Sequence, residues 1–214
     1  MSDHLADMRR SYERGGLAEH ELAPTWLEQF ERWLADAVAA GITEPNAMTL
    51  ATAGPDGAPS ARTVLLKGLD ERGFVLYTNR DSRKGTQATA NPRAALCFGW
   101  IDLQRQVCVT GAVEAVAAAE ADAYFASRPH GSQLGAHASP QSSVVGSRSE
   151  LEDRLAELEA RWPVGTAVPR PDRWGGLRVV PDAVEFWQGR PNRLHDRLRF
   201  RADGAGWVVE RLAP

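Results

Sequence analysis

The sequence predicts a mainly β protein with peripheral helices, an α+β fold in which the strands form an antiparallel barrel. Strand-like apolar segments follow one another from residue 47 to the C-terminus, with few helical stretches between them. Most consecutive segments are joined by short turns, which suit antiparallel strands because parallel strands need long crossover connections. This number of strands favours closure into a barrel over an open sheet.

The first elements of the chain are a polar arm and an amphipathic helix. Residues 1–23 are polar and are expected to order only against another surface. Thr25 and Glu28 then have the spacing of a helix-capping box, and the apolar stripe that follows predicts a helix ending at Gly41. We interpret the tryptophans of this stripe as core residues. Residues 24–214 are expected to form a single domain.

A β-hairpin comes next. Residues 47–53 and 60–68 have strand-like composition and flank the turn sequence GPDG at 54–57. The elements expected after it are, in chain order, a strand over 73–79, a short helix over 82–91, strands over 93–101 and 104–116, a second short helix over 118–127, a loop rich in Ser, Gln and Gly over 128–146, a longer helix over about 148–162, a Pro-rich connector over 164–173, and strands over 174–180, 183–189, 196–202 and 206–212.

Composition narrows the class of protein. The chain has 214 residues, 43% of them hydrophobic and 25% charged, with a formal net charge of −3. Such a balance gives no overall basic field, which disfavours generic nucleic-acid binding. Cys97 and Cys108 lie in apolar strand-like runs and are expected to be reduced, buried thiols. No apolar leader or membrane span is present in the sequence, so we expect a soluble, cytoplasmic protein.

Several familiar motifs are missing from the sequence. No GxGxxG follows a predicted strand, and there is no Walker loop, CxxC pair, HExxH or GxSxG. A Rossmann dinucleotide site, metal catalysis and covalent hydrolysis are therefore disfavoured, and no metal site is expected.

The most informative local feature is a pair of cations at the start of the helix predicted over 82–91. Ser82 has the character of an N-cap, so Arg83 and Lys84 occupy the first turn, where exposed N–H groups and the helix dipole favour acidic residues. A phosphate would satisfy the N–H groups and both side chains. The alternative is a solvated surface pair, which costs only tenths of a kcal/mol and, from this segment alone, is the better interpretation.

Two further segments carry cations that could bind an anion. Arg62 and Lys67 are five residues apart, so in a regular strand they face opposite sides and share one ligand only if the strand is bulged or ends there. Tyr124 and Arg128 have the i, i+4 spacing of one helix face, and Ser132 follows soon after. A phenol, a guanidinium and a hydroxyl together suit a phosphate monoester. The alternative for Arg128 is a cation that complements the helix dipole.

A fourth cation-rich segment lies near the C-terminus. In an extended strand Arg193, His195 and Arg197 point to one face. Three such groups repel each other unless an anion or an electron-rich ring lies over them. The alternative is a solvated edge strand, since Arg199 and Arg201 continue the same face.

Other candidate residues are more weakly marked. Arg9 and Tyr12 lie in the polar arm, for which a disordered tail is the alternative. Gln106, Gln141 and Ser142 are neutral polar residues in apolar or tight contexts, and such amides suit the edge of a heterocycle with alternating donors and acceptors.

Taken together, these segments resemble the pyridoxamine/pyridoxine 5′-phosphate oxidase family. The resemblance extends from residues 8–17 to 210–214, and the matching segments occur in the family's order. The chain departs from the family pattern at Ser11, where an acidic residue is common, and at Glu44, where an aspartate is familiar. The most specific matching segments are RTVLLK (62–67), YTNRDSRK (77–84), QRQV (104–107), YFASRP (124–129), SQLGAHASPQSS (132–143), WGGLRV (174–179) and EFWQGRPNRLHDR (185–197).

The resemblance implies a homodimeric split β-barrel of the FMN-binding type, with FMN at the subunit interface. Arg193 and His195 match the pair that holds the pyridine ring against the flavin, and Arg9 and Tyr12 match a lid over the occupied site. The substrate phosphate is implied to contact Lys67, Tyr124, Arg128 and Ser132. The residues implied to bind FMN are Arg62, Lys67, Tyr77, Thr78, Arg83, Lys84, Gln106, Gln141, Ser142, Trp187 and Arg197, of which Arg83 and Lys84 match the clamp on its phosphate.

The implied reaction is the oxidation of pyridoxamine 5′-phosphate or pyridoxine 5′-phosphate to pyridoxal 5′-phosphate. A hydride passes from the substrate to FMN, O2 reoxidises the flavin to give H2O2, and the amine substrate also releases ammonia. Arg197 is implied to supply positive charge near the reduced flavin. A split-barrel flavin enzyme for another substrate is disfavoured by the second phosphate-and-ring site. A non-catalytic carrier of flavin or pyridoxal phosphate stays open, as does the preference between the two substrates.

Overall fold

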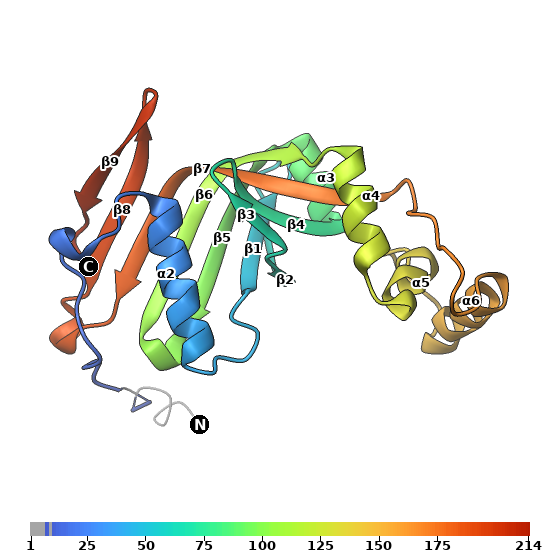
Figure 1. Cartoon of the computed structure of the whole chain (residues 1–214), viewed down its shortest axis with the longest axis horizontal. Helices are drawn as coiled ribbons and strands as arrows, with labels where there is room; N and C mark the ends of the chain where they lie inside the picture. The colour runs from blue at the N-terminus through green and yellow to red at the C-terminus, as the bar shows by residue number, and fades with distance from the viewer. Residues whose placement is uncertain (1–6, 9) are drawn as a thin grey trace.

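The computed structural model describes residues 7, 8 and 10–214, which form a nine-stranded antiparallel sheet with helices at its periphery (Figure 1). The sheet order is β2-β1-β5-β6-β7-β4-β3, with β8 paired to β7 and β9 paired to β8. The predicted mainly β, antiparallel fold is confirmed. The strands are β1 (Ala47–Ala53), β2 (Pro59–Leu65), β3 (Gly68–Asp70), β4 (Gly73–Asn79), β5 (Arg93–Trp100), β6 (Arg105–Ala115), β7 (Trp174–Gln188), β8 (Asp196–Asp203) and β9 (Gly206–Arg211).

Strand β7 is a long central strand that pairs with three other strands of the sheet. Along one edge it pairs with β6, while along its other edge it pairs first with β4 and then with β8. The change of partner coincides with a register shift between Thr110 and Gly111, opposite Pro181. A Cβ on Gly111 would lie 2.0 Å from the carbonyl oxygen of Val180, so only glycine permits this close approach.

The prediction of two separate strands over 174–180 and 183–189 is therefore wrong, because they are halves of one bent strand. Proline at position 181 predicts a break in the strand, but at a bulge the missing N–H of proline is tolerated.

The main core lies between helix α2 (Trp26–Ala39) and the sheet (Figure 1). The Thr25 hydroxyl accepts a hydrogen bond from the Glu28 N–H, as the predicted cap requires. Phe30 is fully buried, with its ring centroid 5.1 Å from that of Phe74 and 4.8 Å from that of Phe98. The tryptophans of the helix are buried in this core, which confirms their interpretation as packing residues.

A smaller cluster joins the remaining helices to the start of β7. Phe125, Leu134, Val168 and Trp174 are its buried members. The interpretation of 128–146 as a loop is wrong, because nine of its residues form helix α5. The helices other than α2 are α3 (Arg83–Ala90), α4 (Ala118–Ser127), α5 (His130–Ala138) and α6 (Arg148–Arg161), and short 3-10 helices cover η1 (Glu19–Glu21), η2 (Ile101–Leu103) and η3 (Pro191–Arg193).

The described part of the arm lies against its own chain. Leu17 and Ala23 are buried, and Leu17 belongs to the main core. Cys97 and Cys108 are unbridged and directly opposite each other on β5 and β6, but both are partly exposed. The expectation that they are buried is therefore wrong, because both thiols lie on the face of the sheet turned away from the core.

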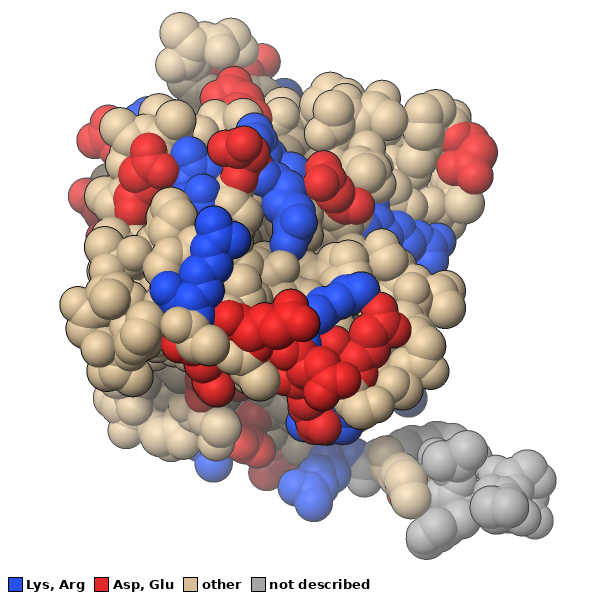
Figure 2. All heavy atoms as spheres, turned by 90° about the vertical axis from the view of Figure 1, so that its right-hand side faces the viewer, with Lys and Arg blue, Asp and Glu red and all other residues tan. Residues whose placement is uncertain are grey.

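The charge distribution on the surface and the lengths of the helices bear on two expectations from composition. On the side that bears α4, α5 and α6, Lys and Arg side chains are interspersed with Asp and Glu rather than forming one basic field (Figure 2). None of the helices formed by the described residues is both long enough and apolar enough to cross a membrane.

Candidate functional site

The first turn of α3 brings cations to a helix N-terminus, as the sequence predicts. Arg83 is the first residue of the helix, and its first turn holds no acidic residue. The Ser82 hydroxyl accepts a hydrogen bond from the Gly85 N–H. A Cβ on Gly85 would lie 2.2 Å from the carbonyl oxygen of Arg80, so glycine lets the helix begin directly against β4.

Lys84 is the buried cation of this turn. Its Nζ donates to Oε1 of Gln141 at 2.8 Å, and the same oxygen accepts from the Thr78 hydroxyl at 3.1 Å. Burial lowers the pKa of Lys84 below its ordinary value, and the nearby charge of Arg62 lowers it further. Burial likewise lowers the pKa of Arg62, followed by the charge of Arg83. These cations destabilise one another in the free protein, and an anion would relieve that repulsion.

The relation between Arg62 and Lys67 is explained by the end of β2. The strand ends at Leu65, and the Lys67 N–H then bonds the Val75 carbonyl oxygen, so the alternation of strand faces does not carry through to Lys67. The Arg62 guanidinium donates to the Leu50 carbonyl oxygen at 3.1 Å. It also donates to the hydroxyls of Thr52 and Ser60 in the same hairpin. Arg62 therefore lies beside Lys84, and Lys67 opens onto the neighbouring cavity.

That cavity has a volume of about 460 Å³ and lies between β4, α4 and α5. Lys67, Lys84 and Arg128 line it, and no Asp or Glu does so among the residues that the structure describes. Tyr124 and Ser132 are also in its wall. A cavity with three cations and no carboxylate is suited to an anionic ligand.

Arg128 is the least satisfied group in this wall. Its Cζ lies 4.9 Å from the ring centroid of Trp174, and its buried Nη1 has no hydrogen-bond partner within the described chain. Burial lowers the pKa of the guanidinium. The prediction that Tyr124 and Arg128 share one helix face is wrong, because α4 ends at Ser127 and Arg128 is its extended C-cap residue. Both side chains nevertheless line the same cavity.

A second group of candidate residues lies on β6, β7 and β8. Gln106 is paired with Trp187, and Trp187 with Arg197, so the three form one row across adjacent strands. The Arg197 guanidinium forms two hydrogen bonds with the Glu185 carboxylate, at 2.7 and 3.0 Å. These bonds raise the pKa of Arg197 and compensate its charge within the chain.

His195 and Arg193 lie beside this row. The His195 ring centroid is 4.7 Å from that of Trp187, and the Tyr12 ring lies 5.8 Å from both. Arg193, His195 and Tyr12 line a cavity of about 480 Å³. The prediction that Arg193, His195 and Arg197 share one face of a strand is wrong, because Asn192 and Arg193 are in a left-handed turn, with φ of 56° and 61°, and β8 begins only at Asp196.

The candidate residues thus form two clusters. The β8 cluster contains Tyr12, Gln106, Trp187, Arg193, His195 and Arg197. The α3 cluster contains Arg62, Lys67, Tyr77, Thr78, Arg83, Lys84, Tyr124, Arg128, Ser132 and Gln141. Ser142 follows Gln141 in an exposed loop with φ of 74°, and Arg9 lies outside the described residues.

The two clusters lie at opposite ends of β7. Thr78 pairs with Gly175 near the start of the strand, whereas Gln106 pairs with Trp187 near its end. Twelve residues of extended chain separate Gly175 from Trp187 (187 − 175), which corresponds to roughly 40 Å along the strand. The ends of β7 lie on opposite sides of the molecule (Figure 1). One small ligand therefore cannot contact both clusters of the same chain.

Sequence reasoning did not single out two carboxylates beside the β8 cluster. Glu185 holds Arg197, and Asp196 bonds the arm. Their signal in the sequence is weak, since each is one acidic residue in a segment rich in cations, and only the pairing of β7 with β8 shows which cation it meets.

The chain is similar to known proteins over almost its whole length. Residues 34–162 match the family model described as pyridoxamine 5′-phosphate oxidase, and residues 174–214 match that of the pyridoxine 5′-phosphate oxidase C-terminal dimerisation region. The chain is 60% identical over 213 residues to pyridoxine/pyridoxamine 5′-phosphate oxidase of Frankia alni, covering 98% of this chain and 88% of that one. It is 58% identical to that of Synechocystis sp., covering 98% of each.

A solved structure is similar as well. PhzG from Burkholderia lata, in complex with tetrahydrophenazine-1-carboxylic acid, has a TM-score of 0.87 and 34% identity, covering 92% of this chain and 98% of that one. An FMN-binding protein from Nostoc punctiforme, with a TM-score of 0.69 and 18% identity, shares the fold.

Proposed function

The chain belongs to the pyridoxine/pyridoxamine 5′-phosphate oxidase family, and on that premise we propose that it oxidises pyridoxamine 5′-phosphate and pyridoxine 5′-phosphate to pyridoxal 5′-phosphate with FMN as its flavin. It is an oxidoreductase of vitamin B6 metabolism. The observation that carries the assignment to phosphate ligands is the α3 cluster, in which buried and partly buried cations meet without a carboxylate.

The residues of the α3 cluster fit two phosphates. The charge of Arg83 disfavours the charged form of Arg62, and the charge of Arg62 disfavours that of Lys84, so the phosphate of FMN would relieve this repulsion. Arg128, whose buried Nη1 has no partner within the described chain, lines the same cavity as Lys67, and its guanidinium would donate to the substrate phosphate there. Tyr124 and Ser132 add hydroxyls to the same wall.

The β8 cluster fits the rings. Trp187, Gln106 and Arg197 would border the flavin, while Arg193 and His195 would hold the pyridine ring of the substrate. Bound FMN would supply the two-electron acceptor that no side chain provides, and O2 would restore it with release of H2O2. The contribution of the chain is to align the two rings and to exclude water from them.

This assignment requires two copies of the chain. Because the clusters lie at opposite ends of β7, an α3 cluster meets a β8 cluster only if a second chain supplies it. Residues 174–214, which match a dimerisation region, contain β7, β8 and β9. A homodimer with two flavins at its interface, each held by both chains, satisfies this requirement.

Mixed dimers provide a test of the shared site. A chain with both Arg83→Ala and Lys84→Ala and a chain with Arg193→Leu should each be nearly inactive as homodimers. When they are co-expressed with different tags and the mixed dimer is isolated, one of its two sites contains only wild-type residues, so we expect about half of the wild-type activity per dimer. Activity no greater than that of the two parents would show that each site is built within one chain.

The activity itself is tested with the purified protein. We expect a yellow flavin spectrum, and addition of pyridoxamine 5′-phosphate in air should produce pyridoxal 5′-phosphate, ammonia and H2O2. Pyridoxine 5′-phosphate should give the same aldehyde without ammonia. Bound flavin without turnover would indicate a carrier, and turnover only of an unrelated substrate would indicate a different oxidase. Absence of flavin from the protein would contradict the proposal.

A further inference from the structure

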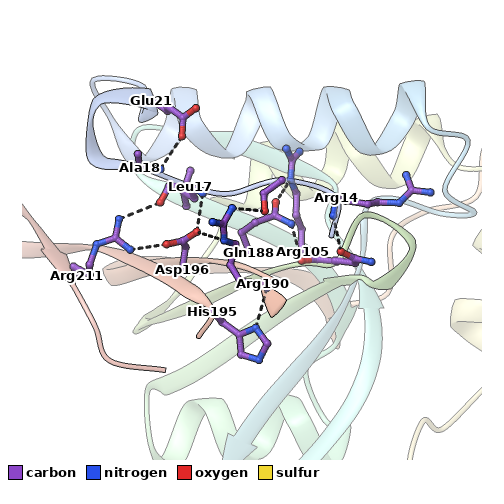
Figure 3. Close-up of polar contacts among 12 residues, drawn as sticks. Arg14, Leu17, Ala18, Glu21, Arg105, Gln188, Arg190, His195, Asp196 and Arg211 are labelled. Carbon is purple, nitrogen blue, oxygen red and sulfur yellow. Dashed lines mark hydrogen bonds and ion pairs between the residues drawn. The ribbon is translucent and has the colours of Figure 1, made fainter. Parts of the chain in front are cut away.

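Asp196 connects the arm to the β8 cluster. Its Oδ2 accepts the Leu17 N–H at 3.0 Å and lies 3.6 Å from Nε of Arg190, and its Oδ1 lies 2.7 Å from Nη1 of Arg211 (Figure 3). The side chain is only 20% exposed. One carboxylate therefore holds a backbone group of the arm between two guanidinium groups of the body of the protein.

The two arginines also bind the arm directly. Nη1 of Arg190 donates to the Gly15 carbonyl at 3.0 Å, and Nη2 of Arg211 donates to the Leu17 carbonyl at 3.1 Å. Arg211 also bonds both carboxylate oxygens of Glu19 in the arm. A Cβ on Gly16 would lie 2.5 Å from Nη1 of Arg190, which shows how closely the arm passes over this group. We call Asp196, Arg190 and Arg211 the latch.

The latch lies next to the residues proposed to hold the substrate ring. The Arg190 N–H points to Nδ1 of His195 at 3.1 Å (Figure 3). A ring nitrogen that accepts this bond carries no proton, so the neutral imidazole carries its proton on Nε2. Nε2 is thus the donor that His195 can offer to a ligand.

The arm leads from the latch to the same place. Five residues before Leu17, the Tyr12 ring lies against Trp187 and His195. A Cβ on Gly189 would lie 2.7 Å from the Tyr12 ring, so the ring lies directly on the backbone there. Between these points, the Arg14 N–H donates to Oε1 of Gln104 at 3.1 Å. The latch and the Tyr12 contact are therefore the two ends of one short tethered segment.

We propose that Asp196 is a positioning residue that holds the arm closed, so that Tyr12 covers His195 and the substrate ring. Its effect on turnover rests on the function proposed above, whereas its effect on the arm does not. Without the carboxylate, the Leu17 N–H loses this acceptor, and Arg190 loses its ion pair with Asp196. Arg211 then keeps only its ion pair with Glu19, so the charges of the two neighbouring guanidinium groups are less well compensated. Repulsion between them then favours release of the arm.

Limited proteolysis of the holoenzyme without substrate tests the arm. In Asp196→Asn, trypsin should cleave after Arg14 about tenfold faster than in the wild type, because cleavage follows the population of the open arm. Asp203→Asn is the matched control, since Asp203 lies at the far end of β8 with its side chain 63% exposed and should leave the rate unchanged. Equal cleavage of Asp196→Asn and wild type would overturn the proposal.

Kinetics separate positioning from a general structural role. We expect Asp196→Asn to raise KM for pyridoxamine 5′-phosphate about tenfold, with kcat within about twofold and flavin content unchanged. In a background of Tyr12→Ala, the same change should raise KM little further, because both substitutions remove one closure. Independent, multiplicative effects of the two substitutions would contradict a role through the arm.

Arg190→Ala provides a second variant in case Asp196→Asn is poorly folded. It removes the ion pair of the Arg190 side chain with Asp196 and its hydrogen bond to the Gly15 carbonyl. It keeps the backbone N–H that bonds His195. We expect faster cleavage after Arg14 and a raised KM here too, and unchanged cleavage would overturn the proposal. If the wild type does not oxidise B6 phosphates, the proposed function fails, and the cleavage rates still decide whether Asp196 holds the arm.

Discussion

Replacing Arg193 with leucine should lower the turnover of pyridoxamine 5′-phosphate by about two orders of magnitude or more, with flavin still bound, because misplacing a reacting group by about 1 Å can cost that much. Arg193 is exposed in the cavity that also contains His195 and Tyr12. Its backbone is left-handed, with φ of 61°, a conformation that non-glycine residues seldom adopt outside constrained sites. No ion pair within the described residues engages its guanidinium, so this group is available to a ligand.

The measurement is a comparison of kcat and of flavin absorbance per chain in the variant and the wild type. Arg201→Leu is the control, because Arg201 lies on the neighbouring strand β8 and is held by Glu210 on β9. It should retain turnover within about twofold, as surface substitutions usually do. Loss of flavin from Arg193→Leu would show that this residue holds the flavin rather than the substrate.

The parts of the fold that depend on local chemistry could be predicted from the sequence. Thr25 and Ser82 each accept the expected N–H of a capped first turn, at 3.2 and 3.4 Å. The strand over 73–79 and the helix that starts at Arg83 are also local, since their apolar run and N-cap lie within a few residues.

The errors arise where a distant segment decides the local structure. Pro181 suggests a break in the strand, but Gly111 on β6 accepts the bend and keeps β7 continuous. Helix α5 was missed because its sequence, HGSQLGAHA, is rich in glycine and polar residues, and its buried Leu134 is stabilised by packing on Phe125 and Trp174. Propensity is a weak guide when tertiary packing supplies the stability.

The site shows the same division. The position of Arg83 and Lys84 in the first turn of a helix could be predicted, because the N-cap and the two cations lie within one helical turn. The distance between the α3 cluster and the β8 cluster could not be predicted from the sequence, because it follows from the length and pairing of β7. The contact of Asp196 with Leu17 joins residues far apart in sequence, and no pattern along the chain indicates it.

Replacement of both Arg83 and Lys84 by alanine should weaken FMN binding strongly while the thermal stability of the flavin-free protein changes little. Each charge-assisted hydrogen bond to a phosphate contributes about 1.5–3 kcal/mol, so loss of both should raise the Kd of FMN by roughly 10² to 10⁴-fold. The flavin-free protein should keep its thermal midpoint nearly unchanged, because the lost packing of the Lys84 stem is offset by relief of its repulsion with Arg62. Fluorescence titration with FMN and a thermal melt of the apoprotein provide the two measurements.

The pH dependence of FMN affinity should separate the contribution of Lys84 from those of Arg62 and Arg83, because arginine stays charged at every pH at which the protein is folded. Phosphate binding needs the charged amine, and burial lowers the pKa of Lys84 from its ordinary value of 10.5 in the free protein. Wild-type affinity should therefore fall as the pH rises through that lowered pKa, before an ordinary lysine would titrate. Lys84→Ala should bind more weakly and lose this fall, whereas the exposed control Arg72→Ala should keep it. If Lys84→Ala retained both the affinity and the pH profile of the wild type, the phosphate of FMN would have to be held elsewhere.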